Sequence, residues 1–272
     1  MRIGCQGWNY DDWVTPAGGP YVFYPEGTRQ KAMLGLYSAV FDTIEVDSTF
    51  YASPSDSVFE AWRERTPEDF VFSLKFPRVV THDLGLRPES FETADLFCER
   101  ASLLEDKLGV LLIQLPPSFV ANKPNASALR TFIGRLPSGI RYSVEFRDPA
   151  WLVDWTIEEL AKHGASVCAT EGEWISRVRC FDILADRRNT HAYVRFMGER
   201  NLDRFDRISR PQDPDLEEWA EHLRSTSGDR EVFVYVSNLF EGFAPATVNK
   251  LRVLTGLPES DPSVLNVQKR LF

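Results

Sequence analysis

The chain has 272 residues, of which 43% are hydrophobic and 26% charged, the balance of an ordinary globular protein. Its formal net charge of −9 repels polyanions at long range, which argues against a nucleic-acid partner. No apolar run approaches the ~18 residues of a membrane span, and no signal peptide opens the sequence. These features predict a cytoplasmic protein with no membrane partner.

Short β-branched runs alternate with amphipathic segments along the chain. The predicted strands, in chain order, are Arg2–Gly7, Thr43–Tyr51, Phe70–Phe76, Gly109–Leu115, Arg141–Phe146, Ser166–Thr170, Ala192–Met197 and Val232–Ser237. The predicted helices are Gln30–Val40, Ser55–Arg65, Phe91–Glu105, Ser127–Leu136, Thr156–Lys162, Leu216–Ser225 and Pro245–Thr255. The least regular stretch, Glu173–Arg188, precedes the seventh strand.

This alternation is typical of βαβ units and a parallel sheet. About eight units without a linker favour closure into a (β/α)8 TIM barrel, a fold of about 250 residues, as one domain over residues 1–272. An open doubly wound sheet is the alternative. It is disfavoured because no glycine-rich nucleotide loop follows any strand.

Four cysteines, Cys5, Cys98, Cys168 and Cys180, lie far apart and form no CxxC pair. Such spacing suits neither a disulfide framework nor a zinc site. We expect reduced, mostly buried thiols.

Polar side chains recur on one face of the predicted strands. Residues of one parity point into a barrel, and the carboxyl ends of all its strands meet at one mouth. Seven polar residues late in their strands should therefore converge there: Glu45, Asp47, Lys75, Gln114, Glu145, Arg147 and Arg195.

Two interpretations fit these charges, which proteins rarely bury without a partner or a use. One is a self-neutralising network of structural salt bridges. The other is a ligand site, favoured because TIM-barrel enzymes place their sites at the carboxyl ends of the strands.

Several segments resemble the YecE-like family, also catalogued as domain of unknown function 72. The similarity extends from the amino terminus to the predicted seventh strand. It rests on Gly4-Cys5-Gln6-Gly7-Trp8-Asn9-Tyr10, Phe41–Tyr51, Phe72–Pro77, Leu112–Phe119, Val144–Arg147 with Trp151, and Tyr193–Phe196. The resemblance implies a TIM barrel and leaves the reaction open.

The chain departs from the family pattern at four places, one of which is an insertion-like segment, Thr15–Tyr21. Asp47 stands where the family usually has Asn, and Met197 where it has a histidine after the strand-seven arginine. Ser237 interrupts a block that usually reads Phe-Asn-Asn. A mechanism that uses the family's histidine is therefore in doubt for this chain.

The first functional hypothesis is an enzyme acting on a small anionic substrate, a phosphate ester or sugar acid, by acid–base or hydrolytic chemistry. Lys75, Arg147 and Arg195 would hold the anion, because guanidinium groups bind oxyanions through paired donors. Glu145 or Glu45 would be the general base.

Five further residues would contact the substrate. Trp8, Tyr51 and Trp151 would form aromatic walls of the anion-binding pocket. Gln114 and Asp47 would supply polar contacts.

Other chemistries remain open. Glu45, Asp47 and Glu145 offer oxygen ligands to Mg²⁺ or Mn²⁺, although only His82, among four scattered histidines, is expected near the mouth. Lys75 could form a Schiff base, as in some lyases and isomerases. A small-ligand sensor without turnover, and a metal-dependent phosphoesterase or nuclease-like hydrolase, are further alternatives. The oligomeric state is left open.

Overall fold

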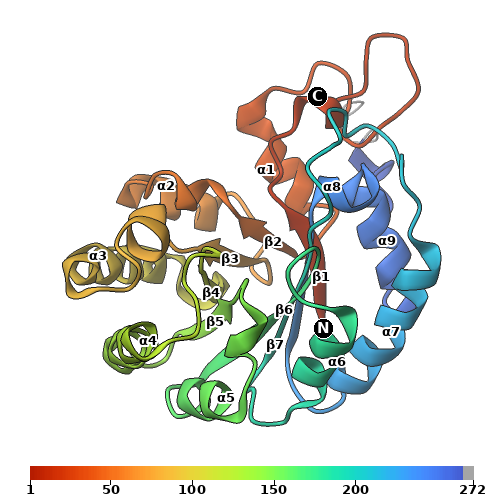
Figure 1. Cartoon of the computed structure of the whole chain (residues 1–272). Helices are drawn as coiled ribbons and strands as arrows, with labels where there is room; N and C mark the ends of the chain where they lie inside the picture. The colour runs from red at the N-terminus through yellow and green to blue at the C-terminus, as the bar shows by residue number, and fades with distance from the viewer. Residues whose placement is uncertain (266–272) are drawn as a thin grey trace.

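Eight parallel strands close into a barrel, each paired with its neighbours in chain order and β8 paired with β1 (Figure 1). The computed structural model describes residues 1–265. The strands are β1 (Arg2–Gln6), β2 (Thr43–Val46), β3 (Val71–Lys75), β4 (Leu108–Gln114), β5 (Arg141–Glu145), β6 (Ala165–Glu171), β7 (Ala192–Phe196) and β8 (Val232–Val236).

Helices follow the strands and surround the barrel (Figure 1). The α-helices are α1 (Gln30–Ser38), α2 (Asp56–Glu64), α3 (Phe91–Ala101), α4 (Lys123–Arg135), α5 (Asp154–Ala161), α6 (Arg177–Ala185), α7 (Asp213–Ser227), α8 (Asn238–Glu241) and α9 (Ala244–Leu254). Short segments of 3-10 or π-helix are η1 (Asp11–Trp13), η2 (Ser48–Phe50), η3 (Val79–Asp83), η4 (Pro88–Ser90), η5 (Ser102–Lys107) and η6 (Pro149–Trp151).

Strand parity separates two buried clusters. Side chains that include Val71, Leu112 and Phe233 form one cluster, and the opposite parity joins a larger core with the helices. Tyr235 belongs to the first cluster, and its hydroxyl lies 2.8 Å from Thr43 Oγ1 and 2.9 Å from Ser73 Oγ. Buried hydroxyls therefore satisfy one another, and the barrel is packed rather than hollow at this level.

The predicted (β/α)8 barrel is confirmed, with two local corrections. The predicted strand Thr43–Tyr51 ends at Val46, because Asp47 adopts helical backbone angles and η2 follows. The irregular stretch Glu173–Arg188 contains α6, which the sequence did not predict.

All four cysteines are buried and free. In the part of the chain that the structure describes, no helix has the length and apolarity that crossing a membrane requires.

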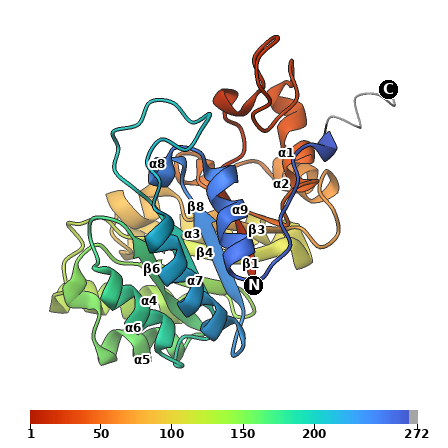
Figure 2. The same cartoon turned by 90° about the vertical axis from the view of Figure 1, so that its right-hand side faces the viewer.

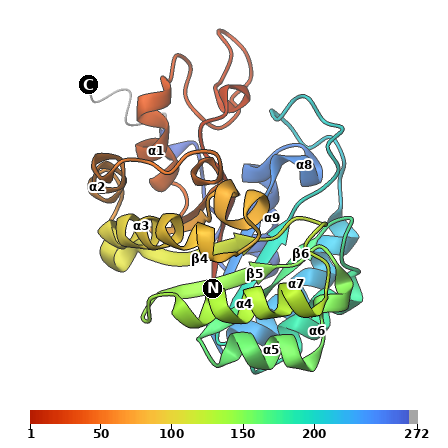
Figure 3. The ribbon, with the colours of Figure 1, turned by 60° about the vertical axis from the view of Figure 1, so that its left-hand side comes forward.

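Two loops rise above the carboxyl ends of the strands, one between β1 and α1 and one between β7 and α7 (Figure 2, Figure 3). They meet where the Phe205 backbone N–H donates to Asp12 Oδ2 over 2.9 Å. The Tyr10 and Phe205 rings also lie edge to face, with centroids 6.1 Å apart. The loops therefore partly cover one side of the mouth.

Candidate functional site at the barrel mouth

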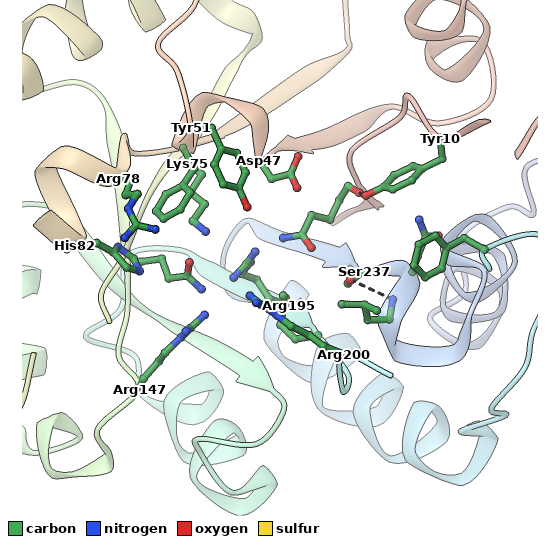
Figure 4. Close-up of a pocket in the computed structure, with 17 residues that line it drawn as sticks. Tyr10, Asp47, Tyr51, Lys75, Arg78, His82, Arg147, Arg195, Arg200 and Ser237 are labelled. Atoms are coloured by element: carbon green, nitrogen blue, oxygen red, sulfur yellow. Dashed lines mark hydrogen bonds between the residues drawn. The ribbon is translucent and has the colours of Figure 1, made fainter. Parts of the chain in front are cut away.

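A cavity of about 530 Å³ opens at the carboxyl ends of the strands. Figure 4 shows side chains from several strand ends and loops directed toward its centre. Of the ten residues that the sequence assigned to a site, six line this cavity: Asp47, Tyr51, Lys75, Gln114, Arg147 and Arg195.

Arg195 lies at the floor of the cavity between two glutamates. Its side chain is 1% exposed, and those of Glu45 and Glu145 are 0% and 2% exposed. Arg195 Nε lies 3.0 Å and 3.1 Å from the two Glu45 oxygens, and its Nη2 lies 2.8 Å from Glu45 Oε1. Its Nη1 donates to Glu145 Oε2 over 2.5 Å. One arginine thus joins both carboxylates.

Neutral donors complete the hydrogen bonding of both glutamates. Gln6 Nε2 and the Tyr193 hydroxyl each donate to Glu45 over 2.6 Å. Gln114 Nε2 donates to Glu145 Oε1 over 2.7 Å. Both carboxylates are therefore solvated by protein groups rather than by water, as buried charges require.

The electrostatics keep Glu145 and Arg195 ionised. Burial alone would raise the pKa of Glu145, but Arg195, Arg147 and the Gln114 hydrogen bond lower it to about 2. Glu45 and Glu145 in turn hold the pKa of Arg195 well above its usual value, against the opposing effect of burial. A carboxylate with a pKa near 2 is a weak base at neutral pH. The contacts thus favour a structural use of both glutamates over the predicted role of general base.

Lys75 differs from Arg195 because no carboxylate is bonded to it among the described residues. Its Nζ lies 3.8 Å from the centroid of the Phe50 ring, a cation–π contact. Burial, followed by the positive charge of Arg195, lowers the pKa of Lys75 to about 8. Its ammonium therefore remains available to an anion in the cavity.

Arg147 is also incompletely paired. Its Nε lies 3.7 Å from Glu145 Oε1 and has no hydrogen-bond partner in the described structure. The guanidinium carbon lies 5.7 Å from the centroid of the Trp174 ring. The fork of Arg147 is positioned by a long ion pair and an aromatic face, which leaves donors for a ligand.

Two other titratable groups line the cavity. Burial and the negative charge of Glu45 raise the pKa of Asp47, although Lys75 and Arg195 lower it in part. Burial and the positive charges of Lys75, Arg147 and Arg78 lower the pKa of His82 to about 4, so its imidazole is neutral at pH 7. The carboxyl group of Asp47 therefore has a pKa that is raised toward neutral pH, unlike that of Glu145.

Trp8 and Trp151, predicted as pocket walls, do not line the cavity. Gly7 has a φ of +76°, which redirects the chain after β1 and ends the alternation that would have turned Trp8 inward. The Trp8 ring instead packs against Trp62, with centroids 5.7 Å apart. Trp151 is 2% exposed, stacks on the Phe119 ring at 5.5 Å and donates its Nε1–H to the Phe119 carbonyl. Both tryptophans therefore contribute to packing.

The loops supply lining residues that strand parity does not predict. One is His82, which the sequence placed near the mouth but did not assign to the substrate. Arg78 lies three residues beyond Lys75, and its position directly after a strand could have indicated it. Tyr10 and Arg200 come from long loops whose course no periodicity predicts. The lining residues that the sequence did not assign to a site are Gln6, Tyr10, Phe50, Arg78, His82, Met197, Arg200, Phe205, Ser237, Asn238 and Leu239.

The proposed metal ligands are not arranged as a metal site. No group of three or more His, Cys, Asp or Glu residues that could hold an ion occurs within residues 1–265. Glu45 and Glu145 instead direct their oxygens toward Arg195, Gln6, Tyr193 and Gln114. The donor set of this site therefore fits an anion better than a cation.

The closed eight-stranded barrel with a polar cavity at its carboxyl mouth defines a protein of the TIM-barrel class. Residues 2–269 match the family model described as "Protein of unknown function DUF72", and the chain belongs to this family.

Three relatives give the range of similarity. The UPF0759 protein YunF of Bacillus subtilis is 27% identical over 259 residues, 88% of each chain. The UPF0759 protein YecE of Escherichia coli is 31% identical over 150 residues, so the match spans about half of this chain (53%) and of YecE (54%). The crystal structure of a DUF72 family protein from Thermotoga maritima has a TM-score of 0.76 at 26% identity. That match covers 94% of this chain and 98% of the other.

Proposed function

We propose that the protein is an enzyme that acts on a small anionic substrate, phosphorylated or a sugar acid, by acid–base chemistry in the mouth cavity. The observation that carries this proposal is the charge of the cavity lining. One carboxylate, Asp47, stands against five cationic side chains, Lys75, Arg78, Arg147, Arg195 and Arg200, in a chain whose net charge is −9.

Not all five cations are equally available. Arg195 is neutralised by Glu45 and Glu145, and Arg78 pairs with Asp83 over 3.1 Å. Lys75 has no bonded carboxylate among the described residues, and Arg147 has only the long ion pair with Glu145 at 3.7 Å. Both side chains are partly shielded from water, which strengthens their attraction for an anion. We assign the anionic group of the substrate to these two side chains.

The acid–base role then falls to Asp47 rather than to Glu145 or Glu45. Its raised pKa allows it to exchange a proton nearer to neutral pH, whereas the hydrogen bonds and cations around Glu145 hold that group ionised. Lys75, with a pKa of about 8, would neutralise charge that develops on the substrate.

The test begins with ligand binding. The full chain is screened by thermal shift against inorganic phosphate, phosphorylated metabolites, nucleotides and sugar acids. Ligands that raise Tm for the wild type are expected to lose this effect in Lys75→Met and Arg147→Gln. Lys31→Met, an exposed lysine on α1, should behave as the wild type.

Turnover is measured next for each ligand that binds. Incubation in D₂O followed by ¹H and ³¹P NMR detects proton exchange, isomerisation and phosphate release without prior choice among them. Asp47→Asn should bind the ligand and lose conversion. Tight binding without conversion by the wild type would overturn the enzyme proposal and leave the alternative, a barrel that binds or senses a small ligand.

One observation favours a second candidate, a Schiff base at Lys75. The Nζ rests on the Phe50 ring without a bonded carboxylate, and its pKa of about 8 leaves part of it as free amine at neutral pH. The amine would attack an aldehyde or ketone, and water would leave as the imine forms. Borohydride would reduce the imine to a stable amine, detected by intact mass. No adduct with any of a panel of phosphorylated aldehydes would eliminate this candidate.

A further inference from the structure

A second cavity, of about 340 Å³, adjoins the first on the side of the loops after β5, β6 and β7. We call it the outer cavity. The two cavities share four lining residues, Arg147, Met197, Arg200 and Leu239. Arg147 therefore stands at the boundary, and one ligand can extend from the cationic cavity into the outer one.

The outer cavity differs in chemistry from the first. Trp174, which lines it, keeps 41% of its surface exposed, so part of the indole is available to a ligand in this cavity. Three carboxylates, Glu145, Glu173 and Glu199, line it together with the shared Arg147 and Arg200, and Glu145 is already paired with Arg195. Glu199 Oε2 accepts a hydrogen bond from Asn201 Nδ2 over 2.9 Å and lies 3.7 Å from Arg210 Nη1, and Glu173 has no ion pair among residues 1–265.

These groups fit a hydroxylated ring better than a second anion. An indole offers an apolar face to the C–H surface of a ring, and carboxylate oxygens accept hydrogen bonds from hydroxyl groups. The same carboxylates repel a phosphate that would enter the outer cavity. The first cavity thus has five cations against one carboxylate in its lining, whereas the outer cavity adds Glu173, Glu199 and the Trp174 ring to the two arginines that it shares.

We propose that the outer cavity binds the uncharged, hydroxyl-bearing ring of the molecule whose anionic group lies on Lys75 and Arg147, which makes the substrate a sugar phosphate. This inference rests on the proposed function, because the first cavity must accept the phosphate. Trp174 then selects the ring, while Lys75 and Arg147 select the charge.

Calorimetric titration of the full chain separates the two parts of the ligand. The probes are inorganic phosphate, glycerol 3-phosphate, ribose 5-phosphate and glucose 6-phosphate. At least one sugar phosphate is expected to bind about ten-fold more tightly than glycerol 3-phosphate, which carries the charge without a ring.

The variants test which side chain produces that gain. Because the Trp174 ring also contacts the Arg147 guanidinium, the gain is measured in each variant as the ratio of its affinity for the sugar phosphate to its affinity for inorganic phosphate. Trp174→Ala should lower this ratio about ten-fold, whereas Trp174→Phe should retain most of it. Val178→Ala, an exposed side chain on neighbouring α6, is the control and should change neither affinity.

The outcomes distinguish the two proposals. If every phosphate compound binds alike, through Lys75 and Arg147, the ring assignment fails and the proposed function stands. If none binds in a manner that depends on these two residues, the proposed function fails and the inference with it. If AMP binds more tightly than the sugar phosphates and loses this advantage in Trp174→Ala, the outer cavity takes a nucleobase and the sugar assignment is overturned.

Discussion

At the scale of single residues, the cations of the mouth have two different uses. Arg195 binds two glutamates and holds the ends of β2, β5 and β7 together, whereas Lys75 and Arg147 direct charge into a cavity. An ion pair already formed costs a ligand the energy of breaking it. Anion binding should therefore depend on Lys75 and Arg147, and much less on Arg195, although Arg195 lines the same cavity.

The charge of Lys75 makes anion affinity depend on pH. Because its pKa is lowered to about 8, Lys75 is charged below that value and neutral above it. The affinity for sulfate, whose own charge is constant in this range, should fall about ten-fold by about one pH unit above the pKa of Lys75. Lys75→Arg stays charged and should show a flat profile. An equal fall in both proteins would assign the titration to another group.

Without a ligand, the same pKa predicts the opposite trend for stability. A free lysine titrates near about 10.4, so between about pH 8 and about pH 10.4 the unfolded chain binds a proton that the folded chain has lost. The Lys75 contribution to the free energy of unfolding should rise with pH in this window. Urea denaturation of the wild type and Lys75→Met across the window measures the difference.

The buried network gives a prediction about stability rather than catalysis. Glu45→Gln removes one of the two charges that compensate Arg195 at a site where Glu45 is fully buried. Leaving a buried charge short of a partner should lower the free energy of unfolding by about 3 kcal/mol. Urea denaturation measures this, with the exposed Glu64→Gln on α2 as control. A variant as stable as the wild type would mean that water or a neighbouring group replaces the lost charge.

Strand parity predicted much of the candidate site and failed for identifiable reasons. It brought Lys75, Gln114, Glu145 and Arg195 to one end of the barrel, because a parallel barrel leaves no other place for the late residues of its strands. Parity cannot tell an ionised glutamate bonded to Arg195 from a free general base. That distinction depends on differences of a few tenths of an ångström in the distances between Arg195 and the glutamate oxygens, which lie on strands distant in sequence.

At the scale of elements, the residue composition of a segment does not always agree with the backbone conformation that the segment adopts. The residues after Val46 are β-branched and aromatic like a strand, yet the chain turns at Asp47 and forms η2. In α6, the buried residues Cys180, Ile183 and Leu184 follow a helical period, but the exposed Val178 among charged neighbours obscures it. By contrast, the bounds of α2 and α9 were predicted to within one residue at each end.

The loop contact above the mouth predicts a local change in dynamics. Asp12 Oδ2 accepts the Phe205 N–H, so Asp12→Ala leaves this amide without its partner. Amide hydrogen exchange near residue 205 should become about ten-fold faster, with global stability unchanged. Asp11→Ala is the matched control, since Asp11 makes no side-chain hydrogen bond to this loop in the described structure. Exchange that is equally slow in both variants would mean that the ring contact of Tyr10 with Phe205 holds the loops by itself.

At the scale of the whole molecule, net charge and site charge have opposite signs. A charge of −9 is spread over the entire chain, while the proposed anion would lie within a few ångströms of Lys75 and Arg147. At physiological ionic strength the screening length is about 8 Å, so distant surface carboxylates weaken anion binding little. Composition therefore argued against polyanionic partners without excluding a small anion.

Closure of the barrel depends on the short pairing between β1 and β2, which we call the seam. Only Cys5 with Ile44 and Gln6 with Glu45 are paired along it in the described structure, and the second pair also carries a hydrogen bond of the buried network. Next to this seam, a Cβ on Gly4 would lie 2.2 Å from the Thr43 carbonyl oxygen. Backbone cannot yield as a flexible side chain does, so any side chain at residue 4 must separate the two strands.

Gly4→Ala is accordingly expected to lower the free energy of unfolding by about 3 kcal/mol, the upper part of the usual range for overpacking. Urea denaturation followed by circular dichroism and tryptophan fluorescence measures the loss. Gly35→Ala makes the same change in α1, where the nearest atom lies 3.9 Å away, and should be neutral or stabilising by up to about 1 kcal/mol. If the seam also positions the network, Gly4→Ala should weaken anion binding in the folded state. Unchanged binding in a destabilised variant would mean that the mouth is held from β3, β5 and β7 alone.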